Sequence, residues 1–295
     1  MRAAQDVSAL RQMLAGLEAG HLPGASSTFS LGAAGPDDTL ALARGGLHEV
    51  YASEGADMPA ATGFSLALAL RAAQTQGQTP HGQAPDRQAP DEERHVPAPI
   101  RPIIWVRQDF LDCEAGRLDA HGLTAFGLDP SRLILVRARD PEQALRAAGD
   151  AVRCPALGAV LLEPWGEPKA LDLTATRRLA LRAGASGVTF FLLRMAPRPS
   201  PSVAVTRWLV RPLLSTPLAA DAPGAPAFAV TLLRHRGGLN GHGWNLEWDH
   251  ESCSFRDIAP LSRPVVSIPA GKPARQATAA QDAASGDIRP FRRAG

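Results

Sequence analysis

Short apolar runs alternate with helical segments through the middle of the chain. Four of these runs are apolar almost throughout instead of at every second residue, namely 103–106, 133–136, 159–162 and 189–193. Continuously apolar strands are typical of a parallel sheet that helices cover on both faces. The segments between them carry helix signals, such as Asp140 at an N-cap position followed by Pro141. The pattern predicts an α/β sandwich with a mostly parallel sheet.

The predicted sheet continues on both sides of this region. Residues 47–51 predict the first strand, and residues 59–73 predict the helix that follows it. Polar and apolar residues alternate with a period of two in three later segments, 204–210, 228–235 and 244–249. Glycine-rich turns separate the last two of them, which indicates a hairpin. We expect these segments to extend the parallel core as antiparallel strands.

Three segments stand apart from the predicted core, which spans residues 39–258. Residues 1–38 predict an amphipathic helix, with Val7, Leu10, Leu14 and Leu17 at helical spacing, followed by a linker. This helix must bury its apolar stripe on its own domain, on another protomer or on a partner. Residues 74–100 and 259–295 contain too few apolar side chains to offset the entropy of ordering, so we expect a disordered insertion and a disordered tail.

Composition excludes several classes of protein. The net charge of +2 is too small for a protein that holds DNA by bulk electrostatics, so we expect any DNA contact to be local or indirect. The three cysteines form no C-x-x-C pair, and the dispersed histidines predict no metal site. No apolar run approaches the roughly 20 residues that cross a bilayer, and no signal-peptide core is visible. We expect a cytoplasmic protein without a membrane segment.

The turn after the first strand stands where a phosphate-binding loop would lie. Such a loop needs glycines, a lysine for the terminal phosphates and a hydroxyl for magnesium. The chain has no lysine before Lys169, and Ala61 stands near the expected lysine position. The residues of this degenerate loop that we single out are Glu54, Gly55, Asp57, Thr62 and Gly63. Two carboxylates without a cation predict poor nucleotide binding.

Glu163 ends the apolar run 159–162, at the position of a magnesium-coordinating carboxylate. Acids at strand ends are often structural, and without a bound nucleotide there is little for magnesium to bridge. We therefore predict no catalytic residue, no cofactor and no metal, and we expect that the chain is not an enzyme.

Two basic segments are candidates for binding. The loop that leaves the run 189–193 carries Arg194, Arg198 and Arg207 among prolines and serines, and could contact DNA phosphates or an acidic partner. The end of the tail carries Phe291, Arg292 and Arg293, which could form a docking peptide. A plain solvated connection and an unselected chain end are the structural alternatives.

Several motifs, which follow one another in the expected order along the chain, resemble those of the ImuA family of bacterial inducible-mutagenesis proteins. The matching segments are 47–50, 127–140, 171–179, 204–208, 233–238 and 244–250. The resemblance runs from about residue 10 to residue 256 and implies a fold similar to the RecA recombinase core. Relative to RecA, the chain departs at the phosphate-loop lysine, at the catalytic acid and at a nucleotide-sensing glutamine, where Leu193 and Arg194 stand. These departures argue against filament formation driven by ATP.

The resemblance implies a role in damage-induced mutagenesis and translesion synthesis, as part of the SOS response. The implied partners are a Y-family-like polymerase homologue of the ImuB type, RecA, or both. ImuA-type proteins are also distantly similar to the SulA cell-division inhibitors. Two alternatives to a non-catalytic accessory protein therefore stay open: a weak DNA-stimulated ATPase and a division inhibitor of the SulA type.

Overall fold

The computed structural model describes residues 27–75, 100–195 and 200–258. The predicted N-terminal helix, the tail from residue 259, Arg198 and residues 76–99 of the predicted insertion lie outside the described residues. The two ends of that insertion meet, because Gln74 and Ile100 form an antiparallel bridge and the Arg101 amide donates to the Ala73 carbonyl. In the described part of the chain, no helix is long and apolar enough to cross a membrane.

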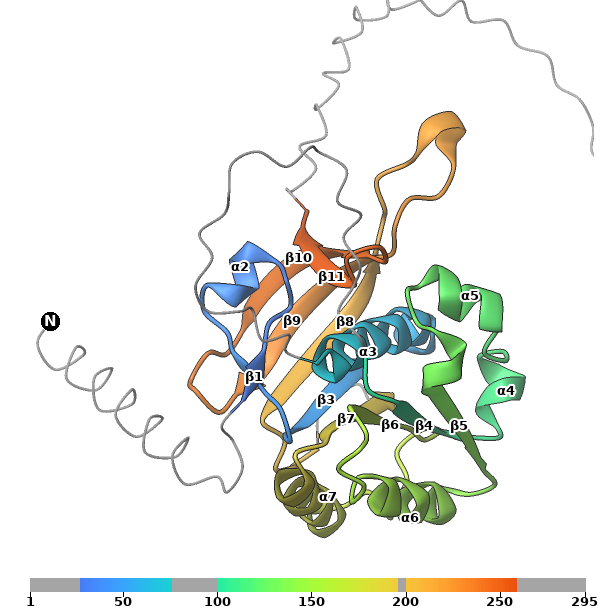
Figure 1. Ribbon diagram of the computed structural model, residues 1–295, viewed down its shortest axis with the longest axis vertical. Coiled ribbons are helices and arrows are strands. Elements are labelled where there is room, and N and C mark those ends of the chain that lie inside the picture. Colours follow the sequence, from blue (N-terminus) through green and yellow to red (C-terminus); the bar gives the residue numbers. More distant parts are fainter. Residues whose placement is uncertain (1–26, 76–99, 196–199, 259–295) are drawn as a thin grey trace, which may run out of the picture. The chain divides into compact units, whose positions relative to one another are not determined.

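The described residues form one large sheet (Figure 1). Its strands are β3 (Leu47–Ala52), β4 (Ile103–Gln108), β5 (Leu133–Ala138), β6 (Ala159–Glu163), β7 (Thr189–Met195), β8 (Thr206–Leu213), β9 (Ala227–His235), β10 (His242–Asp249) and β11 (Ser254–Asp257). Across the sheet they follow the order β11-β10-β9-β8-β3-β7-β6-β4-β5. Strands β3 to β7 run parallel to their neighbours. Strand β8 is parallel to β3 and antiparallel to β9, and β9, β10 and β11 pair antiparallel. The expected fold class, a mostly parallel sheet sandwiched by helices and extended by antiparallel strands, is confirmed.

Helices cover both faces of the parallel part. Helix α3 (Met58–Ala73) lies on one face, and α6 (Pro141–Ala151) and α7 (Leu173–Ser186) lie on the other (Figure 1). Local signals fix the ends of the last two helices. The Asp140 carboxylate accepts from the Gln143 amide, and Gly187 ends α7 with a left-handed φ of 74°. Asp140 is therefore the N-cap that the sequence predicts.

The shorter elements lie around this sandwich. They are β1 (Thr28–Phe29), α2 (Ala34–Asp37), β2 (Leu42–Ala43), η1 (Gly55–Asp57), α4 (Leu111–Glu114), α5 (Ala120–Ala125), η2 (Pro130–Arg132) and η3 (Ala219–Asp221). Strand β1 pairs with β2, and Leu31 is fully buried. Residues 27–38 therefore pack on the core instead of forming part of a linker, because the apolar side chains of Phe29 and Leu31 are buried in the larger core.

One of the three late strands differs from its prediction. Strand β8 is antiparallel to β9, as expected, but it is parallel to β3 on its other side. The reason is that β3 lies between β7 and β8 in the sheet, so β8 does not form a hairpin with β7. Strand β8 thus joins the parallel core to the antiparallel extension.

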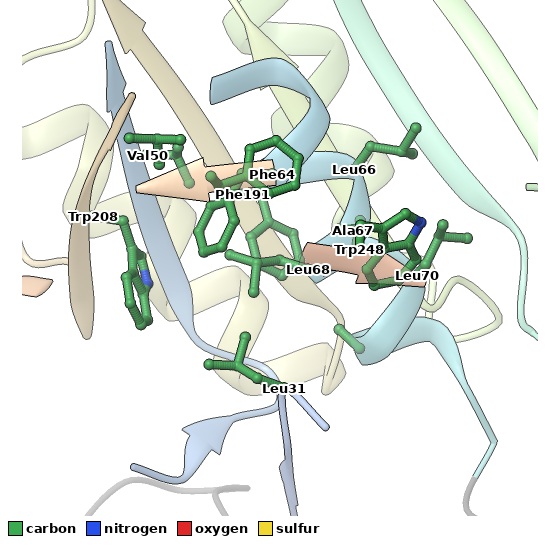
Figure 2. Packing of buried hydrophobic residues seen from close by; sticks show 14 of the residues in the cluster. Leu31, Val50, Phe64, Leu66, Ala67, Leu68, Leu70, Phe191, Trp208 and Trp248 are labelled. Atoms are coloured by element: carbon green, nitrogen blue, oxygen red, sulfur yellow. The ribbon is translucent and has the colours of Figure 1, made fainter. Parts of the chain in front are cut away.

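The larger hydrophobic core lies between α3 and the sheet. Phe64 and Leu68 of α3 point toward Val50, Phe191 and Trp208 of the strands (Figure 2). All five side chains are fully buried. Because α3 is apolar on nearly every side, it is held between the sheet and the segments around it. This packing fixes the N-terminal end of α3, where the candidate site lies.

Candidate functional site

The predicted phosphate-binding turn has no cradle for phosphate. After β3 the chain forms the short helix η1 and enters α3 directly. Asp57 stands at the N-cap position without a side-chain capping bond, and Pro59 removes one of the amide donors of the first turn. A carboxylate at a helix N-terminus interacts favourably with the helix dipole. The same carboxylate repels an anionic ligand. The positive end of the helix dipole is therefore already neutralised by a residue of the protein itself.

Glu163, at the end of β6, is surrounded by donors. Its Oε1 accepts from the Thr62 hydroxyl at 3.1 Å. Its Oε2 accepts from Trp105 Nε1 and from Arg107 Nε, both at 3.0 Å. The side chain is 1% exposed. Burial raises the pKa of this carboxyl group, and the Arg107 charge and the three hydrogen bonds oppose that rise.

Arg107 links Glu163 to the segment that contains α4. Its Nη1 donates to Asp112 Oδ1 and to the Gly116 carbonyl, each at 2.8 Å. The Arg107 side chain is 5% exposed, so this ion pair with Glu163 is shielded from water. A magnesium ion at Glu163 would have to displace the guanidinium and leave it buried without its partner, which costs several kcal/mol, roughly 3–5. The carboxylate therefore acts as an internal counter-ion.

A mainly apolar cavity of about 470 Å³ opens beside this network. The N-terminal half of α3, the loop before α5, α5 itself and the adjoining parts of β8 and β9 form its walls. Its apolar lining includes Met58, Leu66, Leu118, Leu123, Phe126 and Phe228. Thr62 and Arg107 line it too, so the cavity adjoins the place where the sequence predicts a nucleotide site. Such a lining suits apolar groups instead of a triphosphate.

A second buried ionic cluster lies on the opposite face of the sheet, around Glu49 of β3. The Glu49 side chain is fully buried and pairs with Arg194 Nη1 at 3.3 Å and Arg207 Nε at 3.0 Å. The hydroxyl groups of Tyr51 and Ser202 also donate to its Oε2, at 3.0 and 2.7 Å. Burial, with the nearby Glu49 charge, raises the pKa of Tyr51 to about 12. This cluster holds together β3, β7 and β8.

Comparison with known proteins places the chain in a family. No protein-family model matches the sequence. Two curated relatives named "Protein ImuA", from the Caulobacter vibrioides strains NA1000 / CB15N and ATCC 19089 / CIP 103742 / CB 15, are each 33% identical over 174 residues. The match covers 54% of this chain and 67% of each relative. The chain belongs to the ImuA family. A crystal structure of the RadB recombinase aligns with a TM-score of 0.47 and 14% identity, over 78% of this chain and 100% of that one.

In this ImuA-family chain, the structure brings together only part of the predicted phosphate site. Thr62 and Glu163 are hydrogen-bonded to each other, and Gly63 lies at the cavity wall. Glu54 is exposed, and a side chain added at Gly55 would meet only open space. The described residues contain no group of three His, Cys, Asp or Glu side chains that could hold a metal ion.

The expected basic loop is not a free cationic surface at two of its three positions. Arg194 is 6% exposed, and Arg207 is half-buried. Both guanidinium groups are bound to Glu49, because β7 and β8 flank β3 in the sheet. Arg198 lies outside the described residues, as do Val7, Leu10, Leu14, Leu17, Phe291, Arg292 and Arg293.

Sequence reasoning missed Glu49, Trp105 and Arg107. One signal was available for two of them: Glu49 and Arg107 are charged residues in strands whose other residues are mostly apolar. A charge in a buried strand requires a partner. The identity of that partner depends on strand order, which the sequence does not specify.

Proposed function

We propose that this protein is a non-catalytic, RecA-like accessory factor in DNA-damage-induced mutagenesis. In this role it binds a Y-family-like polymerase homologue of the ImuB type, RecA, or both, in the cytoplasm. Contact with DNA is indirect, through these partners. The membership in the ImuA family is consistent with this role.

The contacts of Glu163 carry the proposal. In a working nucleotide site the carboxylate at this strand end faces magnesium and the nucleotide. Here it receives hydrogen bonds from Thr62, Trp105 and Arg107, so the hydroxyl and the acid that would serve the metal bind to each other and to the protein. The chain has no lysine near the turn, and Asp57 stands at the helix end. A fold kept without these catalytic groups supports a role in binding.

Calorimetric titration with ATP and magnesium tests the chemical part of the proposal. We expect no binding at micromolar ATP and no turnover in the presence of single-stranded DNA. Tight binding with turnover that Glu163→Gln abolishes would establish a weak ATPase instead. The matched control is Glu142→Gln, an exposed acid in the first turn of α6 on the other face of the sheet.

Capture experiments test the partner part of the proposal. We expect the full chain to retain the polymerase homologue, RecA, or both, at micromolar concentration in a purified system. Capture of neither protein would reject the accessory role. Overexpression in cells that lack the mutagenic polymerases separates out the SulA-type alternative, because filamentation of those cells would show an action on division that is independent of the polymerases.

A further inference from the structure

The apolar cavity beside α3 has a preformed wall. Phe126 stacks on Trp248 of β10, with 5.4 Å between ring centroids and an interplanar angle of 15°. The Trp248 indole N–H donates to the Phe126 carbonyl at 2.8 Å. On the adjoining side, Arg107 holds the Gly116 carbonyl while it is bound to Glu163. The cavity therefore keeps its shape without a ligand, which reduces the ordering cost of binding.

Apolar side chains at this cavity stay partly open to solvent. Leu118, Leu123 and Phe126 are half-buried although they pack against the main core. Further apolar side chains are exposed close by along the chain, because β8 supplies Pro212 to the cavity and leads into a connection with Leu214 and Leu218, 72% and 62% exposed. Figure 1 shows this connection, which contains η3, projecting from the end of the sheet on the side of α5. An open apolar cavity with exposed apolar side chains nearby fits a polypeptide segment better than a small molecule.

The charge of the lining selects the type of segment. Two arginines, Arg107 and Arg117, line the cavity, and no carboxylate does. Arg107 is committed to Glu163 and Asp112. Arg117 forms a long ion pair with Asp112, with 4.0 Å between Nε and Oδ2, but its side chain is 83% exposed, so the rest of its guanidinium is accessible at the rim. An acidic group beside the apolar anchor would complement this charge.

We propose that the cavity is the docking site for an acidic partner segment that inserts one or two apolar side chains. Aliphatic or aromatic anchors enter between α3, α5 and β9, and an Asp or Glu of the same segment contacts Arg117. This inference rests on the proposed accessory function, and it assigns a site and a chemistry to the partner. In this arrangement Glu163 has a positioning role, because it orients Arg107, and Arg107 holds the cavity wall.

Gly63 offers a way to fill the cavity without unfolding the protein. A Cβ atom at this position would lie 3.5 Å from two ring atoms of Phe228 and 3.8 Å from Phe126, which are ordinary contact distances. The rest of a larger side chain would extend into the cavity. Because glycine inside a helix is less stable than other residues, Gly63→Leu is expected to preserve or raise the midpoint of thermal unfolding. Loss of binding by this variant would then not reflect loss of fold.

The experiment selects short random peptides on the full-length protein by display, followed by affinity measurement on variants. We expect a consensus with an apolar anchor beside Asp or Glu. Gly63→Leu should weaken the selected peptides by at least about tenfold, and Arg117→Glu by several-fold, with a loss that shrinks at high salt. Gly63→Ala should have an intermediate effect. The matched controls are Ala185→Leu and Arg177→Glu, both exposed positions of α7 on the opposite face, and they should leave affinity unchanged.

Three results would overturn the docking site. The first is that no peptide is enriched; the second is a basic consensus; the third is equal binding to wild type and Gly63→Leu. Anilinonaphthalene sulfonate is the small-molecule probe. If its fluorescence responds to wild type but not to Gly63→Leu, and no peptide is enriched, the cavity binds small molecules. That result would also reject the proposal. If Gly63→Leu still captures the polymerase homologue or RecA as wild type does, the docking site fails while the accessory function stands. If wild type captures neither, the accessory function fails, and the peptide selection still tests the cavity.

Discussion

Arg107 and Glu163 form a buried ion pair between the neighbouring parallel strands β4 and β6, with 3.0 Å between Nε and Oε2. Arg107→Met should therefore lower the free energy of unfolding by about 3–5 kcal/mol, because it leaves a buried carboxylate without its cation. Chemical denaturation measures the change. The double variant Arg107→Met with Glu163→Leu should recover a large part of the loss. Arg117→Ala, at an exposed position, is the control. If Arg107→Met lowered the free energy of unfolding as little as Arg117→Ala does, that result would contradict a structural ion pair.

His48 predicts a specific loss of stability in acid. Its Nε2–H donates to the Ala43 carbonyl and its Nδ1 accepts from the Thr206 hydroxyl, which accepts in turn from Trp208 Nε1. This network fits a neutral ring, and burial lowers the pKa of His48 to about 4. The stabilisation linked to this lowered pKa is fully present above the unfolded-state pKa of about 6.5. It declines as the pH falls below that value and is lost as the pH falls through about 4.

We therefore expect the free energy of unfolding to fall by about 3 kcal/mol between pH 6.5 and pH 4 through this group alone. Denaturation curves across this range measure it. His48→Gln should be less stable at pH 7 and should show a flatter dependence on pH. His121→Gln, at a fully exposed side chain, should keep the wild-type slope. An unchanged slope in His48→Gln would show that other groups cause the acid loss.

The buried position of Arg194 predicts that its substitution lowers stability and does not specifically remove DNA binding. Its guanidinium is buried against Glu49 and also donates to Ser200 Oγ at 2.7 Å and to the Leu171 carbonyl at 3.0 Å. Arg194→Ala should cost about 3–5 kcal/mol, measured by chemical denaturation. A variant that folds with wild-type stability but no longer binds DNA or a partner would show that this arginine serves as a contact residue.

The N-terminal amphipathic stripe makes a prediction that does not depend on the described core. On the prediction that this stripe belongs to a partner-binding helix outside the core, Leu10→Asp combined with Leu14→Asp should abolish partner capture. The thermal midpoint should stay within a few degrees, because such a helix contributes little to the stability of the core. Capture and thermal unfolding are measured on the same preparation. The polar-face change Gln12→Asp is the control for added charge. A large fall in the midpoint would show that the stripe packs on its own domain.

The strands and helices were largely predictable because their signals are local. Continuous apolar runs indicated β4 to β7, and Asp140 marked the start of α6. The parallel pairing of β8 with β3 was not predictable, because the alternation in β8 records which face is buried and not which strand lies beside it. The folded position of Leu31 was missed for a similar reason: glycines and prolines around it indicate a loop, whereas burial on the core depends on distant residues.

The sequence by itself determined the α/β pattern, the missing lysine and the acidic turn, since each is a property of residue types and their spacing along the chain. Only the tertiary structure decided what the remaining charges do. Glu163 and Arg107 are 56 residues apart, and Glu49 and Arg194 are 145 apart, yet strand order makes each pair adjacent. A charge removed from water is stable only beside its counter-charge, so the function open to each of these side chains was fixed by the register of the sheet.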